Sequence, residues 1–160
     1  MGKTDIIAAI AAGLTGAVTI FLYLTISLPL LFHIAPLLLY TWDASNALGY
    51  QAASQASVAT IILVGQGSHI IVSLVWGFVF VALLHVAPAI RRMPLAGGFI
   101  YGAFVMLFMH YVIVPLGHAP NNPYTLLGFT NTLIAHTFFF GMPLAWVAAR
   151  FTKEPVRSYP

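Results

Sequence analysis

Hydrophobic residues fall into four long runs along this chain, separated by shorter polar or turn-forming segments. The runs cover about residues 6–32, 66–87, 95–116 and 128–149, and none contains Asp, Glu, Lys or Arg. A helix needs about 20 residues to cross the roughly 30 Å hydrocarbon core of a bilayer, and it satisfies its own backbone hydrogen bonds there. The pattern therefore predicts an all-α membrane protein, a four transmembrane helix bundle forming a single domain over residues 1–160. The first run, at about 27 residues, exceeds the roughly 7–15 apolar residues of a signal peptide, so we interpret it as a span.

Composition excludes most soluble classes. The 160 residues are 61% hydrophobic and 6% charged, with a mean hydropathy of +0.96, whereas soluble domains are about a quarter charged. The lipid bilayer is thus the expected surrounding. The net charge of +3 is dispersed, forms no patch for phosphates, and so excludes nucleic acid as a partner. The absence of cysteine excludes disulfides and thiolate metal sites.

The cations predict an orientation, because cytoplasmic loops are enriched in Lys and Arg. All of them fall before span one, between spans two and three, or after span four. They are Lys3, Arg91, Arg92, Arg150, Lys153 and Arg157. This asymmetry predicts that both termini are cytoplasmic (N-in, C-in). Residues 33–65 and 117–127 then form the outer loops.

The long first outer loop is expected to carry a short interfacial helix. Asp43 and Ser45 could cap a helix over Ala44–Ala59, which would lie on the membrane surface. Its aromatic anchors at headgroup level would be Tyr40, Trp42 and Tyr50.

Small residues predict how the helices meet, since they let helix backbones approach closely in lipid. Span three contains Gly98 and Gly102 four residues apart, and span one contains Ala12, Gly13, Gly16 and Ala17 at the same spacing. These faces could join spans within the chain, a homo-oligomer or a membrane partner. Pro143 should distort span four near Phe139, because proline removes a backbone donor.

Histidines are the distinctive polar groups. His69, His110 and His136 fall in the outer halves of three different spans, and His33 and His118 lie near the same membrane face. His85 is at the cytoplasmic side. Ionisable groups within spans are costly and suggest a function.

Three interpretations of this histidine cluster stay open. Each ring could bond to a backbone carbonyl or to neighbours such as Ser68, Tyr111 and Asn131 and fix helix packing. The cluster could respond to protons, since an unperturbed histidine changes charge near pH 6.5. His69, His110 and His136 could also hold a metal or haem, because imidazole binds zinc, copper and haem iron, although no local ligand motif is present and no cofactor is expected.

Carboxylates limit the mechanism further. Asp5 and Glu154 are expected in the cytoplasm and Asp43 in the outer loop, which disfavours a transporter driven by a carboxylate within a span. Ser68 adjoins His69, but neighbouring helix positions do not face each other and no carboxylate orients the pair. We therefore expect no enzyme and no catalytic residue.

The second half of the chain resembles the YagU family of bacterial inner-membrane proteins. The resemblance rests on Ser68 to Val75, on Leu107 to His110 leading to Pro115 and Leu116, and on Ala135 with His136. It implies a multi-pass protein of the bacterial inner (cytoplasmic) membrane linked to acid resistance, with His69, His110 and His136 at the family positions. His33, His85 and His118 have no place in that pattern.

The function expected from these observations is a non-enzymatic inner-membrane protein linked to acid tolerance through outer-facing histidines. One alternative is a metal- or haem-binding protein or a small-solute permease that uses the same cluster. Another is a structural or partner-binding membrane subunit.

Overall fold

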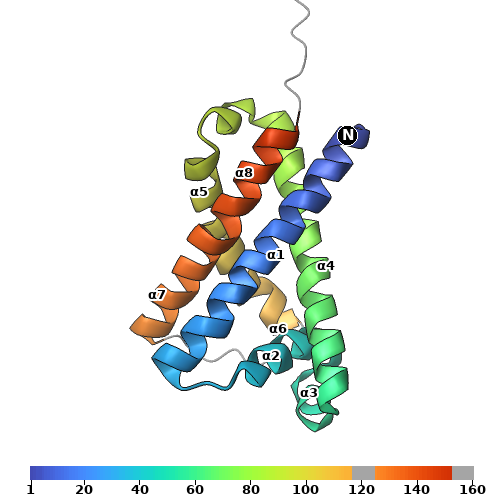
Figure 1. The fold of residues 1–160 in the computed structure, drawn as a ribbon, viewed down its shortest axis with the longest axis vertical. Coiled ribbons are helices and arrows are strands. Elements are labelled where there is room, and N and C mark those ends of the chain that lie inside the picture. The colour runs from blue at the N-terminus through green and yellow to red at the C-terminus, as the bar shows by residue number, and fades with distance from the viewer. Residues whose placement is uncertain (117–124, 153–160) are drawn as a thin grey trace, which may run out of the picture.

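The computed structural model describes residues 1–116 and 125–152, and in them it contains helices and turns but no strand (Figure 1). Four helical stretches of the described chain are long and apolar enough to cross a membrane. They are Lys3–Phe32, Val58–Val86, Pro94–Leu116 and Leu126–Phe151. The prediction of four apolar helices long enough to span a membrane is confirmed.

The first two spans are continuous helices, α1 (Lys3–Phe32) and α4 (Val58–Val86). The other two each contain a π-helical segment, η2 or η3. The third consists of α5 (Pro94–Phe108), η2 (Met109–Ile113) and α6 (Val114–Leu116); the fourth consists of α7 (Leu126–Ile134), η3 (Ala135–Gly141) and α8 (Met142–Phe151).

Both π-helical segments end two residues before a proline, Pro115 or Pro143. Proline has no backbone N–H and its ring crowds the preceding turn, so the helix upstream of it cannot keep regular hydrogen bonding. A wider turn is one way to accommodate this. The irregularity predicted near Phe139 takes this form, since Phe139 lies within η3.

The segment between the first two spans differs from the prediction. A helix over Ala44–Ala59 is wrong: α2 spans Pro36–Leu48, and the shorter α3 spans Tyr50–Gln55. Proline at the first helical position has its φ preset for a helix and needs no donor there, so the helix begins at Pro36. Gly49, with φ of +78°, separates the two helices. Asp43 consequently lies inside α2 and is not its cap.

The start of the second span also needs correction, from Gln66 to Val58. Ser57 caps α4, because its Oγ accepts a hydrogen bond from the backbone N–H of Thr60 at 3.2 Å. The helix therefore begins about two turns earlier than the apolar run indicates, which shortens the loop before it.

The helices pack through their small residues. α1 contacts α4, α8 and η3, while α5 packs against η3 and α8. A Cβ added at Gly13 would lie 2.8 Å from the carbonyl oxygen of Ser73, and one added at Gly98 or Gly102 would collide with the backbone of η3. The predicted small-residue faces are therefore contact faces within the chain, where they are covered by neighbouring helices.

Many of the fully buried residues belong to the parts of α1, α4 and α8 toward the end of the bundle that holds the N-terminus (Figure 1). Alanines of α1 there meet large side chains of α4 and α8. The fully buried residues include Ala8, Ala9, Ala12, Phe80, Val81, Leu84, Leu144, Ala145 and Ala148. At the other end, α2 and α3 lie beside the first half of α4, and Gly65 allows the α2 backbone at Tyr40 to come close.

The start of α1, the short 3-10 helix η1 (Pro88–Arg92) and the end of α8 lie at the same end of the bundle (Figure 1). These elements hold Lys3, Arg91, Arg92 and Arg150. The two remaining cations, Lys153 and Arg157, lie outside the described residues.

Candidate functional site

A cavity of about 130 Å³ lies among α1, α2, α4, η2 and η3, toward the α2 end of the bundle. Most of its wall is apolar or aromatic, as expected between membrane helices. Six polar side chains also line it, namely Asp43, Asn46, Ser68, His69, Ser73 and His136. A buried water occupies about 30 Å³ of liquid volume, so the cavity has room for a few small molecules.

Helix α2 places a carboxylate in this cavity. Leu39, Asp43 and Asn46 line it together. They are spaced four and three residues apart, so they share one face of the helix. The same face that buries Leu39 thus turns Asp43 inward.

His69 joins three helices. Its Nε2 lies 3.1 Å from the carbonyl oxygen of Ala17 on α1, and its Nδ1 lies 3.6 Å from Oδ2 of Asp43 on α2. A carbonyl oxygen only accepts, so Nε2 must carry a proton and donate it. Nδ1 of a neutral ring would then face the carboxylate with a lone pair. A proton on either Asp43 or Nδ1 removes that repulsion. The geometry therefore favours one shared proton between the two groups.

Burial makes the carboxylate easy to protonate. The Asp43 side chain is 22% exposed, and burial raises its pKa to about 7. Desolvation disfavours the charged form, which is the cause of this shift. Within the described part of the chain, two titratable side chains share the cavity with Asp43: His69 from α4 and His136 from η3. The other elements around it contribute apolar or aromatic residues, namely Ile20, Phe21 and Leu24 from α1, Val105 from α5, and Met109 and Ile113 from η2.

His136 offers an acceptor to the cavity, in contrast to the Asp43–His69 pair, which can hold a proton. Its Nδ1 lies 2.9 Å from the carbonyl oxygen of Thr132, one turn earlier, and must donate to it. In the neutral ring, Nε2 therefore keeps a lone pair and can accept a proton or a hydrogen bond. A group that holds a proton and a group that accepts one thus line the same cavity.

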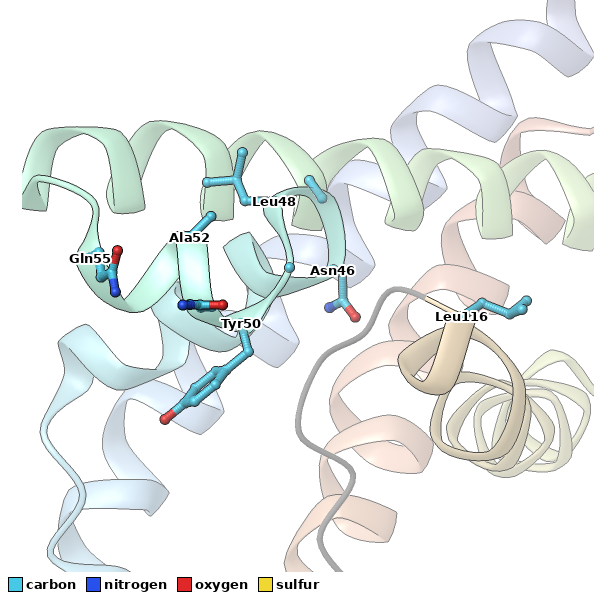
Figure 2. Close-up of a pocket in the computed structure, with 9 residues that line it drawn as sticks. Asn46, Leu48, Tyr50, Ala52, Gln55 and Leu116 are labelled. Atoms are coloured by element: carbon cyan, nitrogen blue, oxygen red, sulfur yellow. The ribbon is translucent and has the colours of Figure 1, made fainter.

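Asn46 lines the cavity and also borders a second, more open space. Its Nδ2 donates to the carbonyl of Trp42 at 3.3 Å, while its buried Oδ1 has no hydrogen-bond partner. Asn46 also lines an open depression of about 860 Å³ formed with the end of α2, α3 and Leu116 (Figure 2). Figure 2 shows the Asn46 side chain projecting from α2, with Leu116 across the depression. The residue therefore borders both spaces, although Tyr50 is the one ionisable side chain among the described residues that line the depression.

The structure brings His69 and His136 to one cavity, whereas His110 is not among the lining residues. Met109 and Ile113, which flank it on η2, line the cavity. The His110 ring packs edge-on against Tyr111, with centroids 4.8 Å apart, and Tyr111 is 67% exposed. Across the described residues, no group of three His, Cys, Asp or Glu side chains is arranged to hold a metal ion.

The remaining candidates lie elsewhere. His33 is exposed at the C-terminus of α1, with φ of 55°, and His118 lies outside the described residues. Asn131 is buried and accepts a hydrogen bond from the Tyr23 hydroxyl at 2.8 Å, which ties α7 to α1. His85 pairs with Asp5 at 3.2 Å near the N-terminal end of the bundle.

Sequence reasoning missed Asp43 and Asn46 as site residues. The signal was present: Leu39, Asp43 and Asn46 recur at helical spacing behind Pro36, which favours helix initiation. A helix cap at Asp43 would place its carboxylate in the loop, away from the spans. Asp43 therefore had no role in the predicted site.

The site can hold a proton between Asp43 and His69 and accept one at His136. Comparison of the chain with protein-family models, with curated proteins and with solved structures found no match. The resemblance to the YagU family therefore stays a prediction.

Proposed function

We propose that this chain is a non-enzymatic, multi-pass protein of a bacterial inner membrane, and that Asp43, His69 and His136 form a proton-responsive site in the outer half of its bundle. The observation that carries the proposal is the pairing of Asp43 Oδ2 with His69 Nδ1 at 3.6 Å, while Nε2 is held by Ala17. A buried pair with one ring nitrogen already committed changes its charge when it gains or loses a single proton.

The cations support the orientation. Lys3, Arg91, Arg92 and Arg150 belong to elements at one end of the bundle, and α2 lies at the other (Figure 1). Under the positive-inside rule the cation-bearing end is cytoplasmic, so the cavity faces the outer compartment. A site on that side is suited to report acidification outside the cell. The link to acid tolerance rests on the family resemblance together with this placement.

Infrared spectroscopy of the purified protein tests the proton site directly. Because burial raises the pKa of Asp43 to about 7, its carboxyl group should be protonated at pH 5 and lose its proton as the pH rises through about 7. The C=O band of a protonated carboxyl group should follow this course in the wild type and be absent in Asp43→Asn. A carboxyl group that is already ionised at pH 5 would contradict the proposal.

Survival of acid-shocked cells tests the physiological part. Asp43→Asn, His69→Gln and His136→Gln should each alter survival relative to wild type at equal membrane levels. His33→Gln is the matched control, because His33 is an exposed histidine at a helix end. Unchanged survival in all three site variants would remove the link to acid tolerance.

A structural subunit is the second candidate function. It is favoured by the bonds from His69 and His136 to backbone carbonyls and by the Tyr23–Asn131 bond, since such bonds hold helices together. A purely structural site would lose stability on substitution of His69 without any carboxyl titration near pH 7. His110 does not line the cavity with His69 and His136, which disfavours a metal or haem centre held by the three histidines.

A further inference from the structure

The unused hydrogen-bonding capacity of the cavity is mostly that of acceptors. Three side-chain donors of the lining are committed to backbone carbonyls: His69 Nε2 to Ala17, His136 Nδ1 to Thr132, and Asn46 Nδ2 to Trp42. What remains is the carboxylate of Asp43, the unpaired Oδ1 of Asn46 and the Nε2 lone pair of His136. The hydroxyls of Ser68 and Ser73 can serve either role. Such a lining fits a guest that is rich in donors.

The charge and the walls favour a cation. Asp43 is the acidic side chain of the lining, and the lining contains no Lys or Arg among the residues that the structure describes. Phe21, Trp76 and Phe140 also line the cavity, and aromatic faces attract cations. A cationic guest would neutralise a carboxylate that is otherwise costly to keep ionised beneath the surface.

The nature of the acceptors distinguishes an ammonium group from a metal ion. A metal ion needs several ligands converging at about 2.0–2.6 Å, and the described residues provide no such group of three. An ammonium group instead donates along several separate N–H bonds, which suits acceptors spread over α2 and η3. At about 130 Å³, the cavity admits a guest of a few heavy atoms.

We propose that this cavity binds a small protonated primary amine, of the size of methylammonium, which donates to Asp43 and Asn46 and displaces the proton held by Asp43 and His69. This inference rests on the proposed function, because the displaced proton is the one that the pair holds.

Binding is then an exchange in which charge balances. The amine enters as R–NH₃⁺, the Asp43–His69 pair releases one H⁺ to solvent, and the carboxylate pairs with the ammonium group. No covalent bond forms. Affinity should therefore rise with pH until the pair has lost its proton, and acid should compete with the amine. Asn46 lines both the cavity and the open depression (Figure 2), so we place the entry of the guest there.

The test uses the purified full chain and methylammonium chloride. Calorimetry in two buffers with different ionisation enthalpies measures affinity and counts released protons, and Trp76 beside the cavity supplies a fluorescence signal. Sodium chloride and tetramethylammonium chloride at equal concentration are the controls, because neither cation has an N–H group. We expect saturable binding of methylammonium alone, with about one proton released per site near pH 6.

Two substitutions probe the acceptors, and one serves as the matched control. Asp43→Asn keeps the side-chain shape and should weaken binding by about tenfold or more, while Asn46→Leu should weaken it several-fold by removing a neutral acceptor. Asp5→Asn changes the carboxylate of the other Asp–His pair, at the opposite end of the bundle, and should leave affinity unchanged.

The outcomes separate the two proposals. Absence of saturable methylammonium binding in a wild type whose Asp43 still titrates near pH 7 would overturn the amine site and leave the proton site standing. Undiminished binding in folded Asp43→Asn, or binding without proton release, would also overturn it. Loss of the carboxyl titration itself would instead refute the proposed function.

Discussion

Gly102→Ala is the substitution that most directly tests the packing of α5 on the site. A Cβ at Gly102 would collide with the carbonyl group of His136, lying 2.8 Å from its carbon and 2.9 Å from Cα of Thr137. Both neighbours are backbone atoms, so no side chain can turn away and the two helices must separate. Overpacking of this kind destabilises the protein by about 1–3 kcal/mol, while alanine in place of glycine stabilises a helix by about 1 kcal/mol. Because the obstacle is backbone, we take the upper part of that range and expect a net loss of about 2 kcal/mol.

Gly67→Ala is the matched control, since Gly67 lies inside α4 and a Cβ there meets nothing within 4 Å. It should be neutral or stabilising by up to about 1 kcal/mol. Reversible unfolding of both variants in increasing SDS, followed by tryptophan fluorescence, gives the free energy of unfolding of each. If Gly102→Ala were as stable as Gly67→Ala, the close contact between α5 and η3 would be wrong, and with it the position of His136.

Two further substitutions test the polar contacts between helices. Tyr23→Phe removes the hydroxyl that donates to buried Asn131, and an acceptor left unpaired there should cost about 1–3 kcal/mol in the same SDS unfolding assay; an unchanged free energy would contradict the bond. Asp5→Asn removes the charge that pairs with His85, whose side chain is 41% exposed, and keeps an amide oxygen that can accept from the Gly2 N–H, so it should cost only about 0–1 kcal/mol; a loss above about 2 kcal/mol would contradict this.

Much of the architecture was predictable because one physical constraint dominates it. Spans such as the one that begins near Ile6 are long, apolar and uncharged, and only a helix satisfies the backbone of such a segment in lipid. The contact face at Gly98 and Gly102 followed from the need of membrane helices for small residues where they meet. The position of the cations at one end of the bundle also followed, because successive spans run in opposite directions and the cations lie before span one, between spans two and three, and after span four.

The site was less predictable because it depends on where each helix begins and on how each helix is rotated about its own axis. A polar residue such as Gln66 suggests the start of a span in the sequence. The helix α4 nevertheless begins earlier, at Val58, because Ser57 caps it there. Likewise, His110 and His136 fall at similar depths, but depth does not fix which way a ring points. The π-helical turns η2 and η3 change the helix rotation at both histidines, and no periodicity in the sequence reports that change.

Asp43 is the residue that an apolar bundle would least require. An asparagine of the same shape would keep the fold of α2 without a carboxylate that must be desolvated, and burial raises the pKa of Asp43 to about 7, so the group is close to changing its charge at neutral pH. Local choices that conflict with the rest of a sequence tend to mark functional positions. The neighbours strengthen that argument, because His69 is fixed by Ala17 in the orientation that leaves Nδ1 toward the carboxylate. The helices thus hold in place a carboxylate and an imidazole whose combined charge depends on one proton.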